Sequence, residues 1–202
     1  MAWKQRFGDA TRSAWRAVER YADHPDPLVL ACNWMALVVA SNQPFYPLFV
    51  EWTAGDGGRL AMLTWLSTPF FLAVPAVSRV SSPAGRALLP LAGLANTLLA
   101  QSLFGLGSGV ALFLGPCLVL AGLAFRPAER RWAFSAVSIG ILACIVVRFW
   151  PWPPQVDLAP GALDALLDIN AVGAASLLVL AGFSFAKAYA VRAPAASDPS
   201  ER

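Results

Sequence analysis

The sequence predicts an all-α, polytopic membrane protein, and three observations support this fold class. Of the 202 residues, 57% are hydrophobic and only 13% are charged, whereas soluble domains carry roughly 25% charged residues. The charges cluster at the N-terminus and in short segments between long uncharged runs. Several of these runs reach the roughly 20 apolar residues that a helix needs to cross a ~30 Å hydrocarbon core. A soluble chain would spread its charge over its whole surface.

Six apolar runs predict six transmembrane helices, at 28–49, 60–80, 86–104, 108–125, 132–150 and 164–187. The third and fourth are separated only by GLGSG (105–109), which we interpret as the turn of a helical hairpin, since one continuous run would be too long for the bilayer. The first run begins too late and is too long for a cleavable signal peptide, so we expect it to act as an uncleaved insertion signal.

Residues 1–27 form a separate element that precedes the first run. On a helical wheel the basic residues Arg12, Arg16 and Arg20 lie opposite an apolar face, which consists of Trp3, Phe7, Ala10, Ala14, Val18 and Tyr21. This pattern predicts an amphipathic helix in the cytoplasmic interface of an anionic membrane. The alternative is a helix that docks on a cytoplasmic partner or on this protein's own helix ends. HPDP (24–27) then ends the helix and turns the chain into the bilayer.

The basic residues predict the orientation of the chain. If the N-terminus is cytoplasmic, 13 of the 15 basic residues fall on the inside, and only Arg59 and Arg148 fall outside. Cytoplasmic loops carry an excess of Lys and Arg, so we expect both termini inside, in the plasma (bacterial inner) membrane. Residues 28–192 would then be the six-helix bundle, and the polar segment 193–202 a disordered tail.

The stretch SNQPFYPLFVEW (41–52) places amides and prolines late in the first membrane run. Pro44 cannot donate a hydrogen bond to Ala40, and Pro47 cannot donate to Gln43. Two carbonyls therefore need other partners in a region with little water. Such a broken helix can build a ligand site, here from Ser41, Asn42, Gln43 and Tyr46. The alternative is that the helix simply ends early, with its aromatic residues along the interface.

The start of the last run, DALLDIN (164–170), carries two acids four residues apart. Asp164 and Asp168 share a helix face with small residues, namely Ala171, Ala175, Gly182 and Ala186. Small residues mark close helix contacts, so we expect both acids to point into the bundle. An acid inside a membrane helix is a functional candidate. The alternative is a pair of helix-start acids favoured by the helix dipole, with Arg148 as a partner.

Asn96 falls near the predicted bilayer midplane, and Asn33 holds a similar place in the first run. For both, the structural alternative is a hydrogen bond between helices, worth about 1 kcal/mol or less. Asn96 is also a candidate ligand-binding residue, because it could form a polar core with the 41–46 break and Asp168 that opens to the outer face.

Several enzyme classes are excluded by the residues present. GLGSG lacks the glycine two before Ser108 that the GxSG segment of rhomboid proteases has, and the single histidine, His24, precedes the first membrane run. No membrane run therefore supplies a histidine base. The cysteines, Cys32, Cys117 and Cys144, lack CxxC spacing, and we expect them to be small buried residues. We expect no cofactor, no metal and no nucleic-acid partner, because no ligand cluster or phosphate-binding loop occurs.

The last run, DINAVGAASLLVLAGFSFAKAYAVR (168–192), carries an outer Asn and an inner basic end. Together with six helices and cytoplasmic termini, it resembles the membrane modules that precede bacterial cyclase and diguanylate cyclase domains. The resemblance is one of topology and covers residues 28–192. It implies a role in signalling.

The sequence therefore predicts a non-enzymatic membrane module that binds or senses a small ligand from the outer face, or that anchors a membrane protein partner. The predicted ligand-binding residues are Ser41, Asn42, Gln43, Tyr46, Asn96 and Asp168. One alternative is a small-solute or proton-coupled transporter, in which Asp168 would titrate. The other is an accessory subunit of a larger membrane complex.

Overall fold

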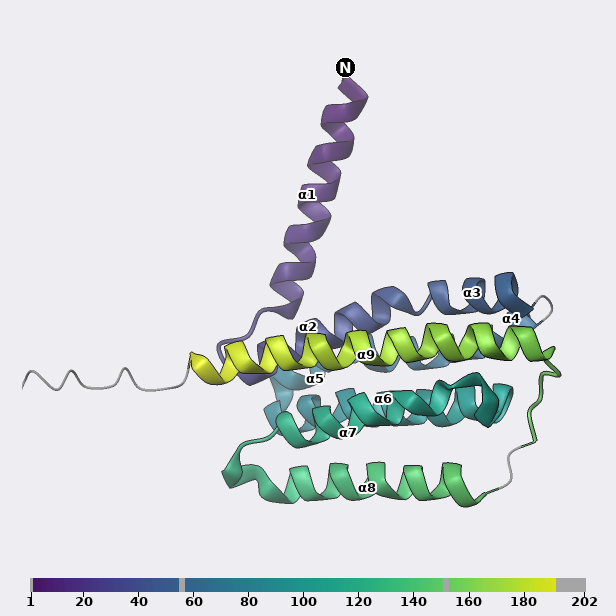
Figure 1. Ribbon diagram of the computed structural model, residues 1–202. Helices are drawn as coiled ribbons and strands as arrows, with labels where there is room; N and C mark the ends of the chain where they lie inside the picture. The colour runs from purple at the N-terminus through teal and green to yellow at the C-terminus, as the bar shows by residue number, and fades with distance from the viewer. Residues whose placement is uncertain (1, 55–56, 151–152, 192–202) are drawn as a thin grey trace, which may run out of the picture.

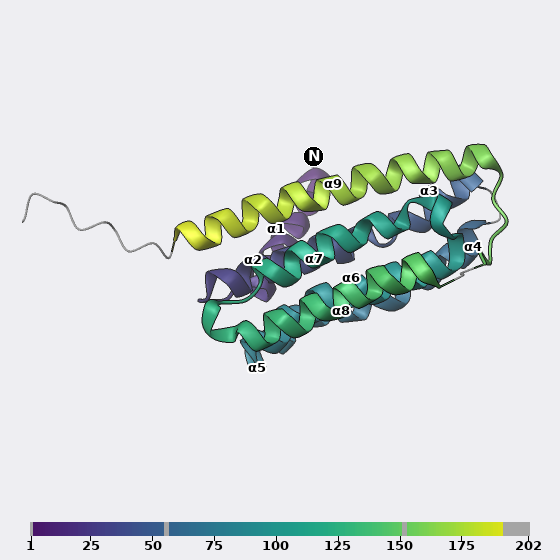
Figure 2. The same ribbon diagram turned by 60° about the horizontal axis from the view of Figure 1, so that its bottom comes forward.

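The chain runs back and forth along one helical bundle. The computed structural model describes residues 2–54, 57–150 and 153–191, and the regular structure of these residues is helical. Successive passes alternate in direction, so that α1 and the C-terminal end of α9 lie at the same end of the bundle (Figures 1 and 2). The passes are α2 (Pro27–Asn42) with α3 (Phe45–Ala54); α4 (Gly57–Ala61), η1 (Met62–Ser67) and α5 (Thr68–Val80); α6 (Ser82–Phe104); η2 (Leu106–Ser108), η3 (Val110–Phe113) and α7 (Leu114–Leu123); η4 (Pro127–Glu129) with α8 (Arg130–Phe149); and α9 (Pro160–Ala190).

By length and composition, the described residues provide four or five membrane spans. Four helices are long and apolar enough, at Arg59–Val80, Ser82–Phe104, Pro127–Phe149 and Pro160–Ala190. The pair α2 and α3, bent by 40°, is the fifth if it counts as one span. The all-α membrane class is thus confirmed, whereas the predicted count of six is not reached, because Val110–Leu123 forms only a shorter apolar helix. At ~1.5 Å per residue this helix extends about 21 Å, less than the ~30 Å core.

The turn between α6 and α7 explains why the fourth run is short. Gly105 and Gly109 have φ of +74° and +73°, a region that side chains disfavour. A Cβ on Gly109 would lie 2.6 Å from Cδ1 of Leu167 and 3.0 Å from its Cα. The GLGSG segment is therefore folded tightly against α9, and η2 and η3 occupy residues that the sequence analysis assigned to a membrane helix.

Helix α1 (Ala2–Ala22) leaves the bundle sideways from the end at which α2 begins (Figure 1). Its last turn is held to the bundle by hydrogen bonds. The Tyr21 hydroxyl donates to the Leu72 carbonyl at 2.6 Å, and Arg79 donates to the Tyr21 carbonyl at 2.8 Å. Asn33 donates to the Ala22 carbonyl at 2.8 Å, so it makes the interhelical hydrogen bond expected of it. The predicted anchors Trp3 and Phe7 lie outside the described side chains.

The HPDP segment ends α1 and begins α2, as the prolines indicate. Asp26 is the N-cap of α2, and its side chain accepts a hydrogen bond from the Leu28 N–H at 3.1 Å. Pro27 occupies the first position of the helix, where a missing N–H costs nothing. The predicted tail, 193–202, lies outside the described residues.

Candidate functional site

The first span is broken midway rather than at its end. Helix α2 has 16 residues before the break and α3 has 10 after it. The structure thus differs from the alternative in which the helix ends at the SNQPFYP stretch, because the chain resumes a helix at Phe45 and continues along the bundle (Figure 1). Pro44 and Pro47 remove two helical donors, which places the 40° bend at this point.

Segment η1 of the second pass satisfies the polar groups of Gln43 at the break. The carbonyl of Gln43, which Pro47 leaves without a helical donor, accepts a hydrogen bond from Trp65 Nε1 at 3.1 Å. The Gln43 side chain is buried and donates to Ser67 Oγ at 2.7 Å. Ser67 in turn donates to the Thr64 carbonyl at 2.8 Å. Two irregular helical segments therefore support each other, and a backbone carbonyl that would be costly in a dry interior is paired.

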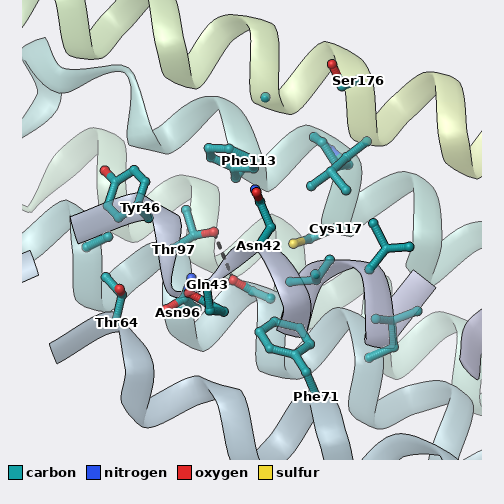
Figure 3. Close-up of a pocket in the computed structure, with 18 of the residues that line it drawn as sticks. Asn42, Gln43, Tyr46, Thr64, Phe71, Asn96, Thr97, Phe113, Cys117 and Ser176 are labelled. Carbon is teal, nitrogen blue, oxygen red and sulfur yellow. Dashed lines mark hydrogen bonds between the residues drawn. The ribbon is translucent and has the colours of Figure 1, made fainter. Parts of the chain in front are cut away.

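A cavity of about 420 Å³ lies beside this break. It is lined by five of the six residues that the sequence predicts, namely Ser41, Asn42, Gln43, Tyr46 and Asn96. Figure 3 labels the last four of them. The other lining residues are mostly apolar and come from α2, η1, α5, α6, η3, α7 and α9. Among the described residues that line the cavity, none carries a charge at neutral pH. The cavity is therefore a mainly apolar chamber with a few amide and hydroxyl groups, as small-molecule sites usually are.

Helix α6 contributes Asn96 and Thr97 to the lining of the cavity, and of the two only Asn96 has an unpaired polar atom. The Thr97 hydroxyl donates a hydrogen bond to the Gly93 carbonyl at 2.8 Å. By contrast, Asn96 Oδ1 is buried and finds no hydrogen-bond partner among the described residues. Both amide atoms of Gln101, one helical turn beyond Thr97, are also buried without a partner among the described residues, but Gln101 does not line the cavity. An unpaired buried polar group costs ~1–3 kcal/mol, so a ligand that pairs with Asn96 Oδ1 in the cavity would be favoured.

Asp168, the sixth predicted residue, does not lie in the cavity. Asp164 and Asp168 are exposed, and so are the small residues that share their face. The buried face of α9 passes instead through Leu166 and Asn170, and Asn170 donates to the Ser108 carbonyl at 2.8 Å. The expectation that both acids point into the bundle is wrong because small residues mark a face without showing whether it turns inward. Arg148, their expected partner, lies over the Phe149 ring.

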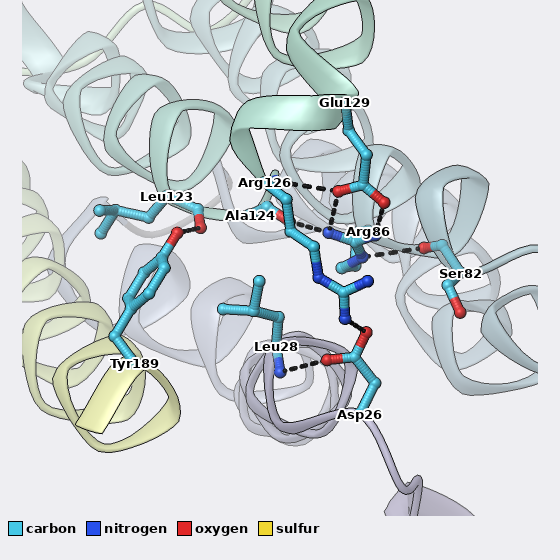
Figure 4. Close-up of polar contacts among 9 residues, drawn as sticks. All are labelled: Asp26, Leu28, Ser82, Arg86, Leu123, Ala124, Arg126, Glu129 and Tyr189. Atoms are coloured by element: carbon cyan, nitrogen blue, oxygen red, sulfur yellow. Dashed lines mark hydrogen bonds and ion pairs between the residues drawn. The ribbon is translucent and has the colours of Figure 1, made fainter. Parts of the chain in front are cut away.

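A buried ionic network lies at the end of the bundle from which α1 leaves (Figure 4). Arg86 is completely buried and forms a two-pronged ion pair with Glu129, at 2.9 and 2.5 Å. Its guanidinium also donates to the Ala124 carbonyl at 2.5 Å. Glu129 accepts the backbone N–H of Arg126 at 2.9 Å, and the Arg126 side chain pairs with Asp26. The network thus joins the starts of α2, α6 and α8.

Tyr189 ties the end of α9 to the same region. Its hydroxyl donates to the Leu123 carbonyl at 2.9 Å, at the last residue of α7 (Figure 4). The sequence analysis missed this network, although one signal was present. The sequence analysis placed Arg86 at the edge of the third apolar run. In the structure α6 begins at Ser82, so Arg86 lies one turn inside the helix. An arginine within a membrane helix needs an acid partner, and Glu129 lies in the connection between α7 and α8.

These features place the protein in a structural class: it is a multi-pass membrane domain with a mainly apolar cavity at a helix break. Comparison with family models then identifies the family. Residues 20–199 match the MASE7 model, so the chain belongs to the MASE7 family of membrane sensor domains. MASE domains are membrane sensors that precede signalling domains such as diguanylate cyclases. No curated protein and no solved structure matches the chain.

The family bears on the interpretations left open by the sequence. A MASE7 domain is a sensor and not a catalytic domain, which agrees with the non-enzymatic prediction. The topological resemblance to modules that precede cyclase domains is confirmed at this level. The transporter alternative is not supported. The accessory-subunit alternative stays a prediction.

Proposed function

We propose that this MASE7 domain senses a small molecule that binds in the cavity at the α2–α3 break. The observation that carries the proposal is the gathering of Asn42, Gln43, Tyr46 and Asn96 around one chamber. These residues come from two passes of the chain that are far apart in sequence. A sensor needs a site at which a ligand meets an adaptable element, and the proline-interrupted first span is such an element.

Signal transfer would run from the cavity to the end of the bundle that carries Arg86. Helix α2 contributes Asn42 to the cavity at one end, and at its other end Asp26 is held by Arg126. A ligand that favours a different bend between α2 and α3 would therefore pull on the network of Arg86 and Glu129. Helix α9 also lines the cavity, through Ser176, and leaves the bundle beside that network. A ligand can shift such an equilibrium only by its difference in affinity for the two states.

We further propose that the chain crosses the membrane six times, with both termini in the cytoplasm. Two observations support this topology. The passes alternate in direction and leave α1 and the end of α9 at one end of the bundle (Figure 2). That end holds basic residues of the helix ends and the loops, including Arg79, Arg86 and Arg126. The short helix Val110–Leu123 would cross with the GLGSG turn dipping below the outer surface. Helix α1 would then lie along the cytoplasmic interface, because it is steeply inclined to the bundle axis (Figure 1).

The proposal is tested by ligand-induced stabilisation of the full chain in lipid nanodiscs. Chloroform-soluble and water-soluble extracts of bacterial cells are added separately, and the melting temperature is followed by tryptophan fluorescence. A ligand at 100 times its Kd stabilises the folded protein by about 2.7 kcal/mol. We expect one extract to raise the melting temperature of the wild type. Asn96→Leu should lose most of that rise without being less stable itself, since it removes an unpaired buried acceptor.

Asp168→Leu is the matched control, because Asp168 is exposed and lies outside the cavity. It should keep the full rise in melting temperature. A wild type that responds to neither extract contradicts the proposal. So does an Asn96→Leu variant that responds as fully as Asp168→Leu.

A further inference from the structure

The walls of the cavity show where a ligand can enter. Toward the α3 end, the cavity borders a buried apolar cluster, to which the lining residues Ala100 and Val110 belong. Toward the α1 end, it borders the main core of the bundle, to which Phe71, Leu89 and Leu120 of the lining belong. A third cluster fills the space between α6, α7 and α8. Buried side chains thus block the routes along the bundle axis, the routes by which a water-dissolved molecule would arrive.

The exposed lining residues all lie on one side, between α2 and α9. They are Val38, at 40% exposed, together with Ser41, Asn42 and Ser176. The surrounding surface of α9 is apolar, with Val172 at 68% and Val179 at 58% exposed. In a 31-residue helix that is long enough to span the bilayer, this surface faces hydrocarbon. The mouth of the cavity therefore opens toward lipid.

The chemistry of the lining determines what it can hold. No charged side chain lines the cavity among the described residues. An ion would lose its hydration there without a counter-charge, which is far more costly than burying a neutral group. The unpaired Asn96 Oδ1 is an acceptor, so a ligand hydroxyl could donate to it. The remaining surface is mainly apolar and accommodates a hydrocarbon body.

We infer that the ligand is a neutral amphiphile dissolved in the bilayer. It enters sideways between α2 and α9 and places a hydroxyl or another hydrogen-bond donor next to Asn96. This inference rests on the proposed sensory role of the cavity and adds the ligand's class and route. A volume of about 420 Å³ accepts a ligand of ordinary small-molecule size.

The experiment uses three photoreactive probes in vesicles that contain the full chain: dodecanol, dodecanoate and dodecane, each with a diazirine. Cross-linked peptides are identified by mass spectrometry. The alcohol should label the cavity residues, and dodecanoate should label them about tenfold less, which corresponds to ~1.4 kcal/mol. Asn96→Leu should lower labelling by the alcohol several-fold and leave labelling by dodecane unchanged.

Two substitutions at the mouth test the route. Ser176→Trp and Val38→Trp should each reduce cavity labelling by the alcohol about tenfold, because they narrow opposite lips of the opening. Ala175→Trp is the matched control, since Ala175 is the exposed neighbour of Ser176 and does not line the cavity. The alcohol should label its cavity as fully as that of the wild type.

The outcomes separate this inference from the proposed function. Equal labelling by dodecanoate and dodecanol refutes the neutral class, and full labelling of both mouth variants refutes the lateral route. If only the water-soluble extract stabilises the protein and the alcohol fails to label the cavity, the inference fails while the sensory site stands. If neither extract stabilises and no probe labels, both fail.

Discussion

Glu129→Ala should destabilise this domain more than any loss of a surface charge. The substitution removes both carboxylate oxygens that pair with Arg86, and it leaves a guanidinium that is 0% exposed. Breaking a buried pair by removing one partner typically costs ~3–5 kcal/mol. Arg86 would keep the carbonyls of Ser82 and Ala124. The Glu129 side chain is 18% exposed, so water could reach part of the gap. We therefore expect a loss near the lower limit, about 3 kcal/mol.

The double variant Arg86→Met with Glu129→Leu separates the interaction between the two charged side chains from the cost of leaving one of them buried alone. Replacing a buried ion pair by apolar groups of similar volume is often neutral. We expect the double variant to lie within about 1 kcal/mol of the wild type, which gives a coupling energy well above that of an exposed pair. Asp9→Ala serves as the surface control. It breaks the ion pair between Asp9 and Arg12. These side chains are 71% and 68% exposed, so the loss in the free energy of unfolding should be ~1 kcal/mol at most.

The assay is reversible unfolding in mixed micelles of dodecyl maltoside and sodium dodecyl sulfate, followed by tryptophan fluorescence. The free energy of unfolding is compared across the wild type, Glu129→Ala, the single variants Arg86→Met and Glu129→Leu, their double variant and Asp9→Ala. If Glu129→Ala costs under about 1 kcal/mol, the burial of Arg86 does not hold in the folded protein. A double variant as unstable as Glu129→Ala would show that packing, not an orphaned charge, causes the loss.

Three further substitutions test single contacts in the same unfolding assay. Trp65→Phe removes the donor to the Gln43 carbonyl and should cost ~1–3 kcal/mol; a loss below ~0.5 kcal/mol would mean that this carbonyl finds another partner. Gly109→Ala should cost at least ~1–3 kcal/mol, because its φ is +73°. Gly182→Ala, in open space on α9, should lose nothing, and equal losses at both glycines would refute the backbone argument. Tyr189→Phe should cost ~0.5–1.5 kcal/mol, and an unchanged stability would show that the end of α9 is not held by this hydroxyl.

The position of the helix break could be predicted from the sequence because its cause is local. Pro44 and Pro47 remove backbone donors wherever they occur in a helix. The path of the chain beyond the break could not be predicted in the same way. The chain resumes its helix because Trp65 and Ser67, more than 20 residues away, satisfy the polar groups of Gln43. Such pairing depends on tertiary contacts that a single sequence does not display.

The side of α9 that faces the bundle shows a second limit of prediction from sequence. Asp168 and its small neighbours recur at helical spacing, and that spacing established that they share a face. Whether the face turns inward depends on which side the other helices cover. The structure covers the face of Leu166 and Asn170 instead, where a larger apolar residue and an amide fill the contact. The ionic network was missed for a related reason, since Arg86 and Glu129 meet only when α6 and the loop before α8 are packed together.

The cavity and the ionic network are both attached to helix α2, and this makes a coupled response mechanically simple. Helix α2 is fixed at Asp26 and interrupted near Asn42, so a change in the bend must be taken up at one of these points. The break carries two prolines and is braced through Gln43 to a 3₁₀ segment, which is a weaker support than a packed α-helix. A ligand that replaces those contacts would move α3 first. A ligand that stiffens the break would instead transmit displacement along α2 to Arg126. Distances between spin labels on the exposed residues Leu48 and Leu142, measured with and without the stabilising extract, distinguish these two responses, because only the first changes the position of α3 against α8.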